Sequence, residues 1–212
     1  MNLRVSDEPA VTAAKSIARR LCDAQRRRRV ATLAMSGGST APAMIEALLA
    51  ERVPWDAVTV WQVDERVAPD GHPDRNAPQL DGLPCAVRLM PVTASDLRAA
   101  AVRYARALPG RFDVVHLGVG DDGHTASWPP GNHDVLASDR LVELVPPFNG
   151  RPRMTLTPHV VNGARARLVL ATGAAKRPVI TRWLGGDRSL PIATVRRVGT
   201  TVVLDPAAAP GE

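Results

Sequence analysis

The sequence predicts an α/β fold, a Rossmann-like three-layer sandwich in which helices cover both faces of a mostly parallel central sheet. Apolar segments of strand length alternate with longer segments whose apolar residues recur at helical spacing. The strand segments are apolar along nearly their whole length, which is typical of parallel strands buried on both faces. We expect residues 1 to 212 to form a single domain with a flexible tail from about residue 206.

The alternation of strands and helices can be followed along the whole chain. Ser6 precedes a first helix, in which Val11, Ala14, Ala18 and Leu21 lie on one face. Strands are predicted at residues 30–35, 57–63, 86–90, 113–117, 166–172 and 200–205. Further helices are predicted at residues 41–50, 94–108 and 175–184, the last interrupted near Pro178.

The net charge of +6 is compatible with nucleic acid or with an anionic small molecule as a partner. The densest basic run, Arg26 to Arg29, contains no aromatic residues on which bases would stack. It follows a predicted helix, where cations favour the negative end of the helix dipole. We therefore expect no nucleic-acid partner and favour a phosphorylated small molecule.

Cysteine content and hydropathy predict the compartment of the protein. Cys22 and Cys85 lack CxxC spacing, so neither a disulfide framework nor a zinc site is expected. The N-terminal segment lacks the apolar core of a signal peptide, and no apolar run approaches the length of a membrane span. We expect a cytoplasmic protein without a membrane partner, as a monomer or a weak homo-oligomer.

The segment SGGST joins the first long strand to the following helix. Gly37 and Gly38 allow backbone amides to face a ligand, and Ser39 and Thr40 add hydroxyl groups at the positive end of a helix. This combination suits a phosphate group. A tight turn followed by a Ser/Thr helix cap explains the same residues without a ligand.

Charged residues follow two other strands. Asp64, Glu65 and Arg66 come directly after the strand at 57–63, and an arginine side chain binds phosphate or carboxylate with two hydrogen bonds. Lys176 lies beyond the strand at 166–172 and offers a point charge. As isolated features, both are also compatible with ordinary charged surface.

The segment GVGDDGHT follows the strand at 113–117 and satisfies the GxGxxG pattern of dinucleotide-binding folds. Pro129 and Pro130 leave too little room for the long helix which that fold requires. A metal site built on Asp122 and His124 lacks a second carboxylate cluster. The remaining hypotheses are a histidine oriented by a carboxylate for general acid or base catalysis, or a structural histidine.

These four polar segments all follow strands of the predicted parallel sheet. The carboxyl ends of such strands meet at one edge of the sheet, where ligands bind in open α/β folds. We therefore expect the four segments to form one site.

Six segments of the chain resemble, in order, those of one enzyme family. They are SGGST, VDERVAPDGHPDRN, LGVGDDGHTASWPPG, RMTLTPHVVNGA, LVLATGAAK and LPIATV, spread over roughly residues 30 to 205. The sequence resembles the 6-phosphogluconolactonases, within the larger group that includes glucosamine-6-phosphate deaminase. The resemblance implies an enzyme without metal or organic cofactor. Its reaction would be hydrolysis of 6-phospho-D-glucono-1,5-lactone to 6-phospho-D-gluconate in the oxidative pentose phosphate pathway.

The resemblance also implies roles for individual residues. His124 would be the general base for the attacking water, and Asp122 and Asp64 would have orienting or electrostatic roles. The phosphate of the phosphorylated sugar lactone would be held by Gly37, Gly38, Ser39, Thr40, Arg66, Arg153 and Lys176. No covalent nucleophile is needed, and Ser127, which lacks a nucleophile elbow, is expected to be a helix or turn residue.

Two other functions stay open on the sequence alone. A glucosamine-6-phosphate deaminase-like activity, or another sugar-phosphate isomerase activity, is the nearer one because SGGST and DGH resemble both branches. The deaminase pattern, however, has an acidic residue shortly after the histidine, where Pro129 stands. A non-catalytic sugar-phosphate sensor would have no use for His124 beside Asp122. The chain departs from the lactonase pattern at Arg75, Trp128 and Pro129 but keeps the proposed proton-transfer and phosphate groups.

Overall fold

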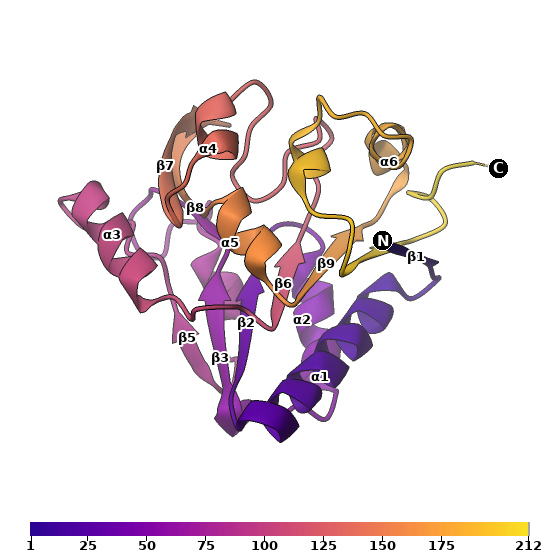
Figure 1. Ribbon diagram of the computed structural model, residues 1–212, viewed down its shortest axis with the longest axis horizontal. Coiled ribbons are helices and arrows are strands. Elements are labelled where there is room, and N and C mark those ends of the chain that lie inside the picture. Colours follow the sequence, from indigo (N-terminus) through magenta and orange to yellow (C-terminus); the bar gives the residue numbers. More distant parts are fainter. Residues whose placement is uncertain (212) are drawn as a thin grey trace.

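The computed structural model of the protein describes residues 1 to 211 and confirms the predicted α/β sandwich. Its centre is a seven-stranded sheet in the order β1-β10-β9-β6-β2-β3-β5, and every neighbouring pair of strands is parallel (Figure 1). The strands are β1 (Asn2–Val5), β2 (Ala31–Met35), β3 (Val58–Gln62), β5 (Ala86–Arg88), β6 (Val114–Leu117), β9 (Ala166–Ala171) and β10 (Thr200–Leu204).

Helices cover both faces of this sheet. They are α1 (Pro9–Arg28), α2 (Ala41–Leu49), α3 (Leu97–Ala107), α4 (His133–Ala137), α5 (Pro158–Gly163) and α6 (Arg177–Leu184). Buried side chains of α1 and α2 form one apolar core with the sheet, and those of α3 to α6 belong to a second core. No helix within residues 1 to 211 is both long and apolar enough to cross a membrane.

Strand β2 shows why the sheet strands are apolar throughout. Side chains alternate between the two faces of a strand, and Leu33 and Met35 belong to the core beneath α1 and α2. Ala34, between them, belongs to the opposite core. A polar side chain at any of these positions would lose its hydrogen bonds to water without replacement.

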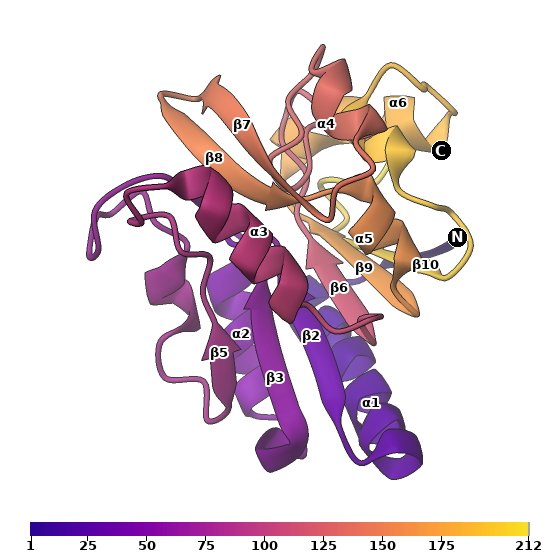
Figure 2. The same cartoon turned by 60° about the vertical axis from the view of Figure 1, so that its left-hand side comes forward.

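A second, antiparallel sheet in the order β4-β8-β7 was not predicted. It consists of β4 (Asp64–Arg66), which follows β3 almost directly, and a hairpin of β7 (Val142–Phe148) and β8 (Arg151–Leu156). Figure 2 shows β7 and β8 beyond the end of the large sheet at which the β6 arrow points. The prediction missed these strands because β4 is three charged residues and β7 contains Pro146 and Pro147, which strands seldom contain.

Two local predictions differ from the structure. Pro178 does not interrupt a helix, because α6 begins at Arg177 and a proline in the first turn lacks only an N–H that has no partner there. Part of the tail expected to be loose from about residue 206 is packed. Ala208 is fully buried and donates its backbone N–H to Asp205 Oδ1 at 2.8 Å, and Arg177 donates to the carbonyl of Ala207. Glu212 lies outside the described residues.

Trp128 joins the loop after β6 to the small sheet and offers a test of the fold. Its side chain is fully buried, and Nε1 donates to the carbonyl of Leu156 at 2.8 Å. We expect Trp128→Ala to lower the free energy of unfolding by about 3–5 kcal/mol, measured by denaturant titration. Val198→Ala, at a side chain that is 70% exposed, should stay within about 0.5 kcal/mol of the unmutated protein. Equal losses in the two variants would contradict this packing.

Candidate active site

A cavity of about 100 Å³ lies at the carboxyl ends of β2, β3 and β6, where the sequence predicts a site. Its lining includes Gly37, Gly38, Ser39, Thr40, Asp64, Arg66, His124 and Arg153. All predicted site residues except Asp122 and Lys176 therefore meet in one cavity. Within residues 1 to 211, no group of three or more His, Cys, Asp and Glu side chains is placed to hold a metal ion.

His124 is held by its neighbour two residues earlier in the chain. Its Nδ1 lies 2.5 Å from Asp122 Oδ1, and the same oxygen accepts the His124 backbone N–H at 3.1 Å. An ionised carboxylate can only accept, so in the neutral imidazole the ring proton lies on Nδ1 and the Nε2 lone pair can accept a proton. Partial burial raises the pKa of the Asp122 carboxyl, but the hydrogen bonds from His124 outweigh it, and the pKa lies below its ordinary value.

The glycine spacing that resembles a dinucleotide motif serves this histidine. A Cβ on Gly120 would lie 2.0 Å from the His124 ring, and the Gly120 N–H donates to the His124 carbonyl at 2.8 Å. Gly123 has a φ of 85°, which favours glycine. The loop is thus a tight turn that aims one side chain, and the next helix, α4, has only five residues.

The SGGST loop is fixed by the segment after β4. The Gly38 N–H donates to Gln79 Oε1 at 3.1 Å, and a Cβ on Gly37 would lie 2.3 Å from Asn76 Oδ1. The hydroxyl of Ser36 is buried in the cavity lining and has no hydrogen-bond partner in the part of the chain that the structure describes. A ligand in this cavity would supply that partner.

Arg66 and Arg153 face the cavity from the small sheet. They are paired residues of the antiparallel strands β4 and β8, so the two side chains leave the sheet side by side. Arg66 Nη1 donates to the carbonyl of Asp74 and to Asn76 Oδ1, and Arg153 Nε donates to the carbonyl of Phe148 at 3.0 Å. Burial, followed by repulsion from Arg66, lowers the pKa of Arg153. Two adjacent cations with carbonyl and amide partners are a candidate site for an anion.

Asp64 shares the cavity with these arginines. Its side chain is buried, and its Oδ2 accepts the Ser127 hydroxyl hydrogen at 2.7 Å. Burial raises the pKa of the Asp64 carboxyl, although the Ser127 hydrogen bond and the two arginines oppose the shift. Ser127 lies in a turn as expected, but its bond to Asp64 could not be predicted, because nothing in the sequence places residue 127 beside β4.

Lys176 is the predicted site residue that the structure places apart. Its Nζ forms an ion pair with Asp121 at 2.5 Å and does not line the cavity. Asp121 belongs to the same loop as His124, so the pair ties this loop to the start of α6. Asn76 and Phe148 are neighbours of the site that the sequence analysis did not single out, although Asn76 belongs to the VDERVAPDGHPDRN segment.

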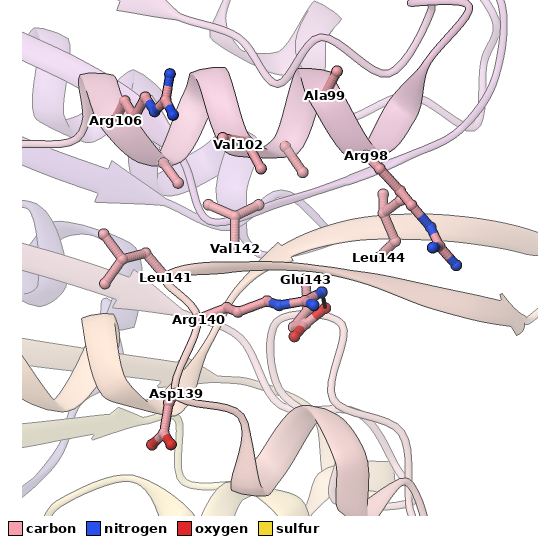
Figure 3. Close-up of a pocket in the computed structure, with 12 residues that line it drawn as sticks. Arg98, Ala99, Val102, Arg106, Asp139, Arg140, Leu141, Val142, Glu143 and Leu144 are labelled. Carbon is pink, nitrogen blue, oxygen red and sulfur yellow. Dashed lines mark ion pairs between the residues drawn. The ribbon is translucent and has the colours of Figure 1, made fainter.

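A larger cavity of about 730 Å³ lies between α3 and β7 (Figure 3). Its walls include Val102 of α3 and Leu141, and Glu143, one of its two acidic residues, pairs with Arg140 at 3.7 Å. None of the predicted site residues lines it. The smaller cavity is the better candidate because a histidine base, an arginine pair and a glycine-rich loop converge there.

The sequence is similar to proteins of one enzyme family. Over residues 5–204 the sequence matches the family described as glucosamine-6-phosphate isomerases/6-phosphogluconolactonase. A 6-phosphogluconolactonase of Nostoc sp. is 34% identical over 169 residues, covering 71% of this chain and 70% of that protein. One of Streptomyces coelicolor is 32% identical over 236 aligned positions, covering 94% of this chain and 89% of that protein.

Solved structures of similar proteins share the fold of this chain. The crystal structure of a 6-phosphogluconolactonase from Shewanella baltica OS155 superposes with a TM-score of 0.88 at 26% identity, covering 97% of each chain. A monomeric glucosamine-6-phosphate deaminase superposes with a TM-score of 0.83 at 18% identity over 98% of each chain, a likeness of the fold alone. The family match spans most of the sequence, and the chain belongs to the glucosamine-6-phosphate isomerase/6-phosphogluconolactonase family.

Proposed function

We propose that the protein hydrolyses 6-phospho-D-glucono-1,5-lactone to 6-phospho-D-gluconate, the second step of the oxidative pentose phosphate pathway. The observation that carries the proposal is that His124, held at Nδ1 by Asp122, lines the same cavity as the Arg66 and Arg153 pair. A proton acceptor and an anion site in one cavity suit an ester-like substrate with a phosphate group. The 6-phosphogluconolactonases among the relatives and solved structures support this choice.

The phosphate group would bind between the small sheet and the SGGST loop. Arg66 and Arg153 would balance its two negative charges, and charge-assisted hydrogen bonds of this kind are among the stronger ones in proteins. The amides of Gly37 and Gly38 and the hydroxyls of Ser39 and Thr40 would bind the remaining oxygens. Lys176 would take part only after leaving Asp121.

The reaction would follow from the position of the imidazole. Nε2 of His124 takes a proton from water as the water oxygen bonds to the lactone carbonyl carbon, and the electron pair of the C=O bond moves to its oxygen. When the tetrahedral intermediate collapses, the bond to the ring oxygen breaks and the imidazolium returns the proton to that oxygen. The products are a hydroxyl group and a carboxylic acid, which then ionises. Asp122 stabilises the imidazolium between the two proton transfers.

Asp64 would bind a hydroxyl group of the sugar. Ser127 donates to its Oδ2. Oδ1 accepts no hydrogen bond from residues 1 to 211, and the residue lines the cavity. A buried carboxylate oxygen gains most from a donor that the ligand brings. This role would select polyhydroxylated substrates over simple lactones.

Removal of the imidazole tests the proposed base. We expect His124→Ala to lower the rate of lactone hydrolysis above the spontaneous reaction by about 10²–10⁴, the usual contribution of general base catalysis. The lactone is generated in situ, and circular dichroism and thermal unfolding establish that the variant is folded. If the unmutated protein gave no acceleration, the lactonase function would be wrong. Turnover of glucosamine 6-phosphate would then favour the deaminase, and binding without turnover the sensor.

Arg66→Lys tests the anion site, because lysine keeps the charge but loses the planar pair of donors. We expect KM for the phosphorylated lactone to rise about tenfold to a hundredfold, the range for losing a hydrogen bond to a charged group. Hydrolysis of unphosphorylated glucono-1,5-lactone serves as the comparison and should change little. Equal losses on both substrates would argue against phosphate binding by Arg66.

Asp64→Asn tests whether burial of this carboxylate destabilises the fold. Because the folded state raises the pKa of Asp64, it binds the proton more tightly than the unfolded chain, and its stability falls as pH rises through that range. Asparagine removes this cost, so Tm should rise at pH 7 and rise less at pH 4, while lactonase activity falls. A gain of about 1 kcal/mol corresponds to roughly 2–4 °C in a chain of this length. A lower Tm at pH 7 would contradict the argument.

A further inference from the structure

One aromatic ring contacts both halves of the candidate active site. The centroid of the Phe148 ring lies 5.0 Å from that of the His124 ring, with the two planes at 81°. The guanidinium carbon of Arg153 lies 5.1 Å from the centroid of the same ring. Edge-to-face ring contacts and cation–π contacts at these distances are favourable. Phe148 thus lies next to both the proposed base and the proposed phosphate ligand.

The backbone around Phe148 holds the ring in this place. Phe148 is the last residue of β7, and Asn149 and Gly150 turn the chain with φ angles of 51° and 83°. Two positive φ angles in a two-residue hairpin are typical of a tight type I′ turn. The pairing of β7 with β8 shifts register between Val145 and Phe148, so a bulge re-aims the residue at the strand end.

Arg153 makes a second contact with Phe148, through a backbone hydrogen bond. Its Nε donates to the Phe148 carbonyl at 3.0 Å, and no acidic side chain within residues 1 to 211 lies within ion-pair distance of its guanidinium. The Arg153 guanidinium contacts both the carbonyl and the ring of Phe148. A phosphate that binds this guanidinium would therefore affect both contacts. A displacement of Arg153 would be passed to the ring.

The orientation of the His124 imidazole is set by the groups that contact the ring. Asp122 holds the ring at Nδ1, and Gly120 lies against its Nδ1 and Cε1 atoms. Packing of Phe148 against the imidazole adds a contact from the small sheet. The position of Nε2, which must meet the attacking water, then depends on Phe148 as well as on the loop that carries His124.

We propose that Phe148 is a positioning residue that couples binding of the substrate phosphate at Arg153 to the orientation of the His124 imidazole. This inference rests on the proposed lactonase function. The binding energy of a remote phosphate group then contributes to the chemical step and not only to affinity. Phe148 itself does not touch the reacting atoms.

The first measurement separates the effects on kcat and KM. Phe148→Leu keeps the apolar bulk but removes the ring, and we expect kcat for the phosphorylated lactone to fall about tenfold to a hundredfold, the size expected when a catalytic group is misplaced. KM should change little, because both arginines remain. Phe148→Tyr keeps the ring and should restore kcat. Leu141→Ala, an exposed residue just before β7, is the matched control and should behave like the unmutated protein.

The second measurement tests the coupling itself by supplying the lactone and the phosphate as two separate molecules. Hydrolysis of glucono-1,5-lactone is followed with and without inorganic phosphate. We expect phosphate to raise kcat/KM about tenfold in the unmutated protein, a usual size for coupling between two ligands. In Phe148→Leu the activation should be lost. The inhibition constant of phosphate against the phosphorylated lactone should stay the same, because phosphate still binds.

These outcomes distinguish the two proposals. If the unmutated protein does not hydrolyse the phosphorylated lactone, the proposed function itself fails. If it hydrolyses that lactone but phosphate does not activate the unphosphorylated one, or activates Phe148→Leu equally, the coupling role is overturned. A kcat that is unchanged in Phe148→Leu, or a loss in Leu141→Ala of the same size, overturns the positioning role.

Discussion

The buried carboxylate of Glu65 is the interaction on which the rest of the candidate site depends. It accepts hydrogen bonds from the backbone amides of Arg66, Asn76 and Ala77 and from the Gln62 side chain, and it forms an ion pair with Arg75 at 3.1 Å. A buried carboxylate without such partners would cost several kcal/mol. The segment between Val67 and Asn76 must therefore close over β4, which carries Asn76 to Gly37 and against the Arg66 side chain.

This closure joins two sheets that contribute different chemistry. The loops after β2 and β6 of the large parallel sheet carry the hydroxyl groups and His124, and the small antiparallel sheet carries Asp64, Arg66 and Arg153. The Ser127 bond to Asp64 and the ring contact of Phe148 with His124 connect the two sets. Neither sheet alone contains a complete site, so small changes in their relative position would alter both binding and proton transfer.

The sequence predicted six of the seven strands of the large sheet, because these strands are apolar runs between helical segments. The edge strand β1 was not predicted, because its four residues are mostly exposed and include Asn2 and Arg4. The small sheet escaped prediction, since three charged residues and a strand with two prolines show no alternating pattern. The site residues that follow strands, such as Ser39 and His124, were predicted because the carboxyl ends of parallel strands share one edge.

Neighbours brought close only by folding carry no local signal in the sequence. Phe148 approaches His124 through a hairpin turn, and Ser127 approaches Asp64 across a large separation in sequence. Arg153 was named only from the resemblance, and its pairing opposite Arg66 follows from the β4–β8 register. For Lys176, the position after a strand predicted a contact with phosphate. In the folded chain its side chain pairs with Asp121 instead.

The β4–β8 register has a consequence for the ligand-free protein. Placing two guanidinium groups opposite one another in a partly buried sheet brings like charges together, which destabilises a strand pair. Asp64 lies nearby, although burial raises the pKa of its carboxyl. An anion that enters the cavity would supply a further counter-charge to the two arginines. Free phosphate in solution would therefore act both as a stabiliser of the small sheet and as a competitor of the substrate.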